Sequence, residues 1–255
     1  MLTLHSARAS VAIDLDGGRL TSLVIDGFEI MVTEGDRPTR WGSFPMIPWC
    51  GRLDRGRFAF EGHEYQMPIT SAPHANHGRT HLQMWELESL TTIRTQLVDP
   101  WPFGGYATQE FMLTDTSLTI NVSVNNNARS MPAMAGWHPW FRRQLTARGA
   151  PAELHFDADA IYATGPDDIP TGELCPIPPA PWNACFVGVA NGPLIVWPGA
   201  LSIALSSSFE DWVIFTEPDH ALCVEPQSGP PNELNGEPFV VTPGEPLKGS
   251  MTISW

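Results

Sequence analysis

The sequence predicts an all-β fold, and three observations support this prediction. Short runs alternate apolar and polar residues, most clearly Leu118–Asn125, where the alternation is unbroken as in a half-buried strand. The 25 Pro and 22 Gly residues are spread along the chain, which favours strands and turns over long helices. Asp-Gly pairs between apolar runs, as at Asp26-Gly27, are typical of hairpins because Gly tolerates a positive φ.

The same pattern predicts strands along the rest of the chain. Hairpins are expected within residues 10–31 and around the turn at Glu61-Gly62. Further strands are expected at Met84–Leu87, Glu110–Leu113, Leu201–Ser206, Trp212–Phe215 and Met251–Trp255. The segment from Ala150 to Pro181 is rich in Pro, Gly and Asp and is expected to be a long loop, an element that often carries binding groups on a β scaffold.

Composition narrows the function classes. The chain has 255 residues, enough for a sizeable core, and a net charge of −14. This charge argues against nucleic-acid binding, which needs clustered Lys and Arg, and more weakly against a strongly anionic substrate. Residues 1–18 lack an apolar core of signal-peptide length, and no run of 18 apolar residues occurs. With four dispersed cysteines and no Cys-x-x-Cys pair, we expect a cytoplasmic protein that has no zinc site and no contact with a membrane.

One histidine in an aromatic stretch is a first candidate for chemistry. His138 lies between Trp137 and Trp140 in Gly-Trp-His-Pro-Trp-Phe-Arg. Apolar rings disfavour the charged imidazole, which tunes its proton affinity, and they also suit the C–H face of a sugar. The alternative is a packed core turn with a satisfied histidine.

Glu225 is a second candidate. It follows the apolar run Leu222-Cys223-Val224, and partial desolvation would raise its pKa and make it a better base near neutral pH. The alternative is a glutamate that ends a strand and points to water.

Arg52 and a group of histidines complete the candidates. The Arg52 guanidinium, near Trp49, is either solvated or a fork of donors for sugar oxygens. His74, His77 and His81 have offsets that could suit a metal on a helix, but the neighbouring Pro and Gly favour a loop without a complete ligand set. A His before Gly, as at His77, is better suited to the close approach of another group.

Nine short segments along the chain occur in an order and spacing that resemble the aldose 1-epimerase, or galactose mutarotase-like, family. The resemblance runs through almost the whole chain. The segments that carry it are Gly17-Gly18-Arg19-Leu20, Pro48-Trp49-Cys50-Gly51-Arg52-Leu53, His77-Gly78, Trp85-Glu86-Leu87, Met131-Pro132, Gly136-Trp137-His138-Pro139-Trp140-Phe141, Pro170-Thr171-Gly172, Val224-Glu225-Pro226 and Gly229-Pro230-Pro231-Asn232.

The resemblance implies a β-supersandwich of large antiparallel sheets over residues 1–255, a single domain with an open cleft for a monosaccharide. It also implies an isomerase that needs no metal and no organic cofactor. Glu225 would be the general base and His138 the general acid, while Arg52 and His77 would hold the sugar. Trp137 is the aromatic residue that we expect against the sugar ring.

One departure from the family pattern concerns substrate preference. The family has an Asp that accepts hydrogen bonds from sugar hydroxyls, and this chain has Asn183 at that place. Asn still accepts through its carbonyl but carries no charge and adds donors. Three alternatives accompany the mutarotase hypothesis: a relative acting on a phosphorylated hexose, a carbohydrate-binding or regulatory protein without turnover, and a β domain with no sugar site in which the clustered Trp and His residues pack the core. The sequence does not indicate the oligomeric state.

Overall fold

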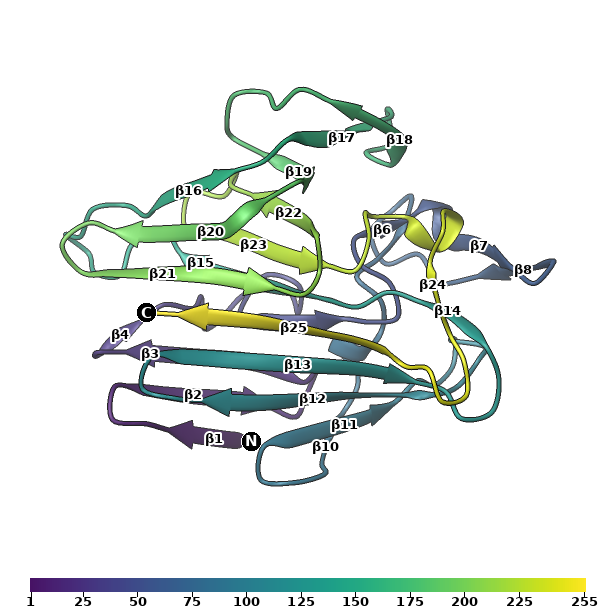
Figure 1. The fold of residues 1–255 in the computed structure, drawn as a ribbon, viewed down its shortest axis with the longest axis horizontal. Helices are drawn as coiled ribbons and strands as arrows, with labels where there is room; N and C mark the ends of the chain where they lie inside the picture. Colours follow the sequence, from purple (N-terminus) through teal and green to yellow (C-terminus); the bar gives the residue numbers. More distant parts are fainter.

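The fold is all-β, as predicted. The computed structural model describes residues 1–255 and consists of two large antiparallel sheets, three two-stranded ribbons and three short 3₁₀ turns (Figure 1). The two sheets enclose one cluster of 55 buried hydrophobic residues. None of the helical segments has the length or the apolar character needed to span a bilayer.

The first sheet has eleven strands and contains the strands that carry the site. Its order is β1-β2-β3-β5-β15-β23-β22-β19-β17-β18, with β4 paired to β3. The strands are β1 (Leu2–His5), β2 (Ala9–Asp14), β3 (Arg19–Ile25), β4 (Phe28–Glu29), β5 (Ser43–Met46), β15 (Gly136–Arg142), β17 (Ala160–Thr164), β18 (Pro170–Cys175), β19 (Asn183–Val187), β22 (Asp211–Phe215) and β23 (Ala221–Gln227).

The second sheet has eight strands, in the order β10-β11-β12-β13-β25-β21-β20-β16. They are β10 (Glu86–Leu87), β11 (Thr92–Gln96), β12 (Tyr106–Leu113), β13 (Ser117–Asn125), β16 (Glu153–Asp157), β20 (Ala190–Trp197), β21 (Leu201–Ser207) and β25 (Leu247–Ser254). The ribbons and turns are β6 (Arg52–Leu53) with β9 (Ala75–Asn76), β7 (Arg57–Phe60) with β8 (His63–Gln66), β14 (Met131–Ala133) with β24 (Phe239–Val241), η1 (Asp54–Gly56), η2 (Thr80–Leu82) and η3 (Glu233–Asn235).

The predicted hairpins and the alternating strand are confirmed. β2 pairs with β3 across the turn that contains Gly17 and Gly18, and β7 pairs with β8 across Glu61-Gly62. In β13 every second side chain is buried, because one face of this strand packs on the core. The period-2 pattern therefore predicted the buried face of β13 correctly.

The prediction of a long loop over residues 150–181 is wrong. This segment forms β16, β17 and β18, and the turn residues from Gly165 to Asp168 occupy only the tip of the β17–β18 hairpin. β16 and β18 are edge strands, and β18 buries no side chain fully. β18 has no apolar alternation to reveal it, and the short alternation in β16 is surrounded by turn residues. The pairing of such edge strands is decided by distant partners.

Two neighbouring strands in the first sheet are buried on both faces. All seven residues of β23 and the first six of β15 are buried. Their inner face meets the second sheet, where Trp137 Nε1 donates to Gln109 Oε1 of β12. Their outer face is the floor of the site described next.

Candidate active site

Strand register brings the two candidate catalytic residues together. Gly136 of β15 lies opposite Gln227 of β23, and Trp140 lies opposite Cys223. Counting inward from both pairs places His138 opposite Glu225, with both side chains on one face of the sheet. The contact between two residues far apart in the sequence therefore follows from one antiparallel pairing.

Two prolines interrupt the ladder between these strands at the same place. No residues are paired between Gly136–Gln227 and Trp140–Cys223. Pro139 and Pro226 follow His138 and Glu225 directly, and neither has an N–H to donate. On its other side β15 stays paired with β5, where His138 lies opposite Phe44.

The His138–Glu225 pair is in direct contact and almost fully buried. His138 Nε2 lies 3.3 Å from Glu225 Oε1, and the two residues are 5% and 2% exposed. The Gln227 Nε2 amide donates to the other carboxyl oxygen at 3.4 Å. The imidazole is held between the rings of Phe44 and Trp140, whose centroids lie 4.9 and 5.3 Å away. The rings and the amide thus fix the orientation of both groups.

Burial shifts the proton affinities of the pair in opposite directions. Desolvation raises the pKa of the Glu225 carboxyl well above its usual value, opposed by the hydrogen bond from Gln227 and the charge of Arg52. Desolvation also lowers the pKa of His138 to about 3, helped by the charges of His81 and Arg19 and opposed by a backbone hydrogen bond. Burial therefore favours the uncharged form of both groups, the carboxylic acid and the neutral imidazole.

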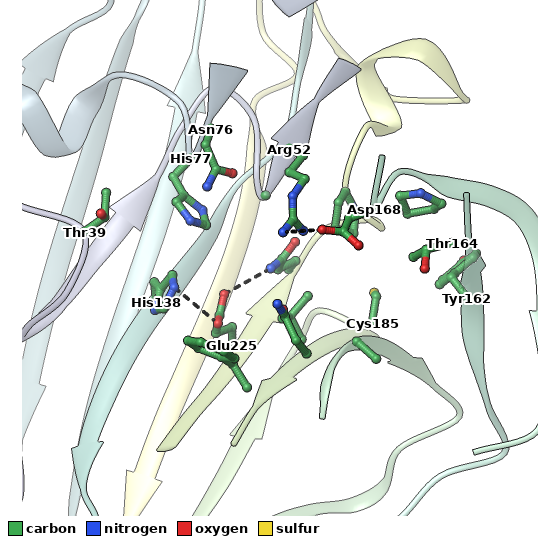
Figure 2. Close-up of a pocket in the computed structure, with 18 of the residues that line it drawn as sticks. Thr39, Arg52, Asn76, His77, His138, Tyr162, Thr164, Asp168, Cys185 and Glu225 are labelled. Carbon is green, nitrogen blue, oxygen red and sulfur yellow. Dashed lines mark hydrogen bonds and ion pairs between the residues drawn. The ribbon is translucent and has the colours of Figure 1, made fainter. Parts of the chain in front are cut away.

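The pair lies at the floor of a cavity of about 550 Å³. Figure 2 shows Arg52, Asn76 and His77 on one side and Tyr162, Thr164 and Asp168 on the other. The cavity is mixed in character, because aromatic and charged groups share its wall. This combination suits a small polar ligand with apolar C–H faces.

The short β6–β9 ribbon delivers three polar residues to the cavity. Arg52 lies opposite Asn76 in the ribbon, and His77 follows Asn76 directly. All three residues line the cavity. Two segments of the chain that the sequence analysis treated separately are therefore one structural unit.

His77 has a left-handed backbone and an edge-on contact with the ring of His138. Its φ is 59°, and the following Gly78 has φ 67°. An added Cβ at Gly78 would lie 2.1 Å from the Ile47 carbonyl oxygen, so this close approach requires glycine. The His77 ring is 5.0 Å from that of His138, and desolvation followed by the charge of His138 lowers its pKa well below the usual value.

The structure places five of the six predicted site residues around this cavity. They are Arg52, His77, His138, Asn183 and Glu225. Trp137 is not among the lining residues: it is 1% exposed and faces the second sheet. Trp140, which is three positions after Trp137 and two after His138 along β15, lies on the face of His138 and lines the cavity instead.

Sequence reasoning missed four lining residues of note. Gln227 is two positions after Glu225 and Trp140 two after His138, so strand alternation would have found both once β15 and β23 were recognised. His220, whose ring stacks on Trp140 at 6.0 Å, and Asp168 had no such signal. Their position depends on loops and on pairing between distant strands.

The predicted absence of a metal stays a prediction, but the donor chemistry supports it. His74 is separated from His77 and His81 by its contacts with the Arg55 N–H and the Asp167 carbonyl. The one three-residue set with metal-ligand spacing is His138, Cys223 and Glu225, whose ligand atoms lie within 4.8 Å of one another. Burial raises the pKa of Cys223 and of Glu225, and protonated groups are poor ligands.

Two stacked antiparallel sheets with a buried carboxyl–imidazole pair in an open cavity define a β-sandwich of the galactose mutarotase-like class. A galactose mutarotase-like protein from Clostridium acetobutylicum superposes with a TM-score of 0.84 at 17% identity, over 98% of this chain and 93% of that one. Galactose 1-epimerase from Lactobacillus acidophilus NCFM superposes with a TM-score of 0.79 at 14% identity, over 99% and 92%. At these identities the likeness establishes the fold.

The chain belongs to the aldose 1-epimerase family, whose model matches residues 1–254. Among relatives by sequence, the uncharacterized protein YphB of Escherichia coli K12 is 27% identical over 266 aligned positions, which cover 90% of this chain and 91% of YphB. The resemblance drawn from the sequence segments is therefore confirmed at the level of family and fold.

Proposed function

We propose that the protein is a mutarotase, which interconverts the α and β anomers of a free aldose by acid–base ring opening and reclosure. The observation that carries the proposal is the buried pair of His138 and Glu225, 3.3 Å apart at the floor of an open cavity. Family membership supports the reaction class.

The reaction needs one proton acceptor and one proton donor on either side of the anomeric carbon. A base takes the proton from the anomeric hydroxyl while an acid protonates the ring oxygen, and the ring opens to the aldehyde. Rotation about the C1–C2 bond and reclosure with the roles reversed give the other anomer. We assign the base to Glu225 and the acid to His138.

The uncharged form of the pair, which burial favours, carries the one proton that this exchange requires. Transfer of the carboxyl proton from Glu225 to the His138 imidazole produces the carboxylate and the imidazolium. The charge of Arg52 favours this state, because it lowers the pKa of Glu225. Reclosure returns the proton, so no net proton is consumed. The pair is thus matched to a reaction in which donor and acceptor exchange roles.

The walls of the cavity supply the groups that would hold the sugar. Arg52, His77 and Asn183 offer polar contacts, and Trp140 offers an aromatic face beside the acid–base pair. Trp137, buried against the second sheet, has no part in this proposal. Neither a metal nor a cofactor is needed.

A phosphorylated sugar is less compatible with the same cavity. The two cations in its wall are both paired, Arg40 with Asp36 and Arg52 with Asp168. Arg142 and Arg143, at the end of β15, donate mainly to backbone carbonyl groups. Phosphate recognition instead uses charged donors that are free to meet the anion.

Anomer exchange measured by NMR on a panel of free and phosphorylated aldoses tests the proposal. We expect acceleration for at least one free aldose by the wild-type protein, and loss of that acceleration in His138→Asn, which keeps a polar side chain at this position but cannot transfer the proton. Sugar binding without acceleration would support a carbohydrate-binding protein instead. Acceleration only for phosphorylated sugars would move the substrate to a hexose phosphate.

A further inference from the structure

A second carboxylate faces the cavity from the β17–β18 hairpin. Asp168 Oδ2 lies 3.2 Å from Nη2 of Arg52, and both residues line the cavity (Figure 2). The contact joins the tip of one hairpin to the β6–β9 ribbon across the mouth of the cavity. The Asp168 side chain remains 67% exposed and that of Arg52 32% exposed, so a ligand in the cavity can reach both.

The hairpin tip that carries Asp168 is fastened by a buried histidine. His74 Nε2 donates to the Asp167 carbonyl at 3.0 Å, while its Nδ1 accepts the Arg55 N–H at 3.1 Å. His74 is 2% exposed. The His74 imidazole, with both ring nitrogens engaged, ties the hairpin tip to the segment that follows Arg52. The position of Asp168 relative to Arg52 is thus set by the scaffold and does not depend on the ion pair alone.

The backbone at Asp168 adopts a conformation that is unusual for a residue with a side chain. Its φ is 56°, in the left-handed region, within a turn closed by the Gly165 N–H to the Ile169 carbonyl at 2.9 Å. Gly would fit this position without steric cost, and Asp and Asn are the best tolerated alternatives. Such conformations cluster at functional sites, and here the result is a carboxylate aimed into the cavity.

We propose that Asp168 and Arg52 together form a clamp for two adjacent sugar hydroxyls and that Asp168 is a specificity-determining residue. The contact uses one nitrogen and one oxygen, and neither side chain makes another hydrogen bond in the structure. One hydroxyl donates to Asp168 Oδ1 while its neighbour accepts from a free Arg52 N–H. The clamp selects uncharged sugars with adjacent hydroxyls, because Asp168 repels an anionic substituent. This inference rests on the proposed function.

A competing role for the same ion pair has the opposite consequence. If Asp168 only formed an ion pair with Arg52 that a sugar must displace, removal of the carboxylate would free Arg52 and strengthen sugar binding. If Asp168 accepts a hydrogen bond from a sugar hydroxyl, removal of its charge weakens binding, because a charge-assisted hydrogen bond is replaced by a weaker neutral one. The sign of the change in affinity therefore distinguishes the two roles.

The test compares Asp168→Asn with Asp167→Asn as the matched control. Asn tolerates the left-handed backbone, so the hairpin is retained. The control alters the neighbouring carboxylate, which pairs with Arg55 outside the cavity lining, and leaves the main-chain bond to His74 in place. Kd is measured by calorimetry for D-glucose, D-galactose, D-mannose and D-xylose, and KM and kcat by NMR exchange for the best of these.

We expect Asp168→Asn to raise Kd and KM about tenfold, equivalent to about 1.4 kcal/mol, with kcat within about threefold. The control should match the wild type. Among monodeoxy analogues of the best sugar, one should bind the wild type about tenfold more weakly yet lose nothing further in Asp168→Asn, as expected when the deleted hydroxyl and the carboxylate are partners.

An unchanged or lowered Kd in Asp168→Asn, with the wild type binding and turning over, would overturn the clamp and leave the mutarotase proposal standing. If wild type binds none of the sugars, both proposals fall together. If wild type binds a sugar without turnover and Asp168→Asn weakens that binding, the clamp stands and the proposed catalysis falls.

Discussion

Replacement of Glu225 by Gln is the most direct perturbation of the proposed chemistry. The amide has the size of the carboxyl group and can keep both of its contacts. Its oxygen accepts from Gln227 Nε2, and its NH₂ donates to His138 Nε2. Packing is therefore preserved, while proton transfer is lost.

The expected loss of turnover is large and the expected change in stability has a defined sign. A positioned acid–base group contributes roughly 10²–10⁴-fold to the rate, which is about 2.7–5.4 kcal/mol of barrier. Burial raises the pKa of Glu225 in the folded protein. The contribution of this group to stability is therefore fully present below its pKa in the unfolded chain and is lost as the pH rises through its pKa in the folded protein. The Gln variant should therefore gain thermal stability relative to wild type between pH 4 and pH 8.

The assay is anomer exchange by NMR, run beside thermal unfolding at both pH values. Glu210→Gln is the control, because Glu210 is exposed and lies outside the cavity; both its rate and its Tm should match the wild type. If Glu225→Gln keeps kcat within tenfold of wild type, Glu225 is not the base. If its Tm advantage is the same at both pH values, the carboxyl is not buried in the way described.

Three further predictions concern pH, specificity and the close approach beside the cavity. Because the His138 pKa is lowered to about 3, kcat/KM should keep its plateau down to about pH 4 and fall on the alkaline side as the pair loses its proton; an acid limb near pH 6.5 would contradict this. Asn183→Asp should change the ratio of kcat/KM between epimeric aldoses by about tenfold, since a charged acceptor replaces an amide; an unchanged ranking of the sugars would contradict a role in specificity. Gly78→Ala should lower the free energy of unfolding by about 2 kcal/mol more than Gly62→Ala, measured with denaturant, because both glycines have positive φ but only Gly78 has a carbonyl oxygen in the way.

The local part of the fold was predictable because it depends on neighbouring residues. Strand period and Gly-containing turns identified the β2–β3 and β7–β8 hairpins and the face of β13. The segment of residues 150–181 was misread because its turn residues dominate the composition. In this segment β16 pairs with β20 and β17 pairs with β19, and both partner strands come later in the chain.

The candidate site was predictable in its residue types and less so in its geometry. His138 and Glu225 stood out by their surroundings in the sequence, and the family resemblance supplied their roles. Trp137 was predicted at the site in place of Trp140, because the sequence does not show which face of β15 lines the cavity. In the strand, side chains alternate between the two faces, so Trp137 points to the core and Trp140 to the cavity. No local pattern indicated Asp168 as a cavity residue.

The sequence by itself determined the all-β class, the family and the candidate catalytic residues, because strand alternation, turns and ordered motifs are local properties of the chain. Only the tertiary structure decided which of these residues meet. The pairing of β15 with β23 sets His138 against Glu225, and the fold of the β17–β18 hairpin sets Asp168 against Arg52. Both contacts join segments distant in the sequence, and burial in a common core fixes their register and their proton affinities.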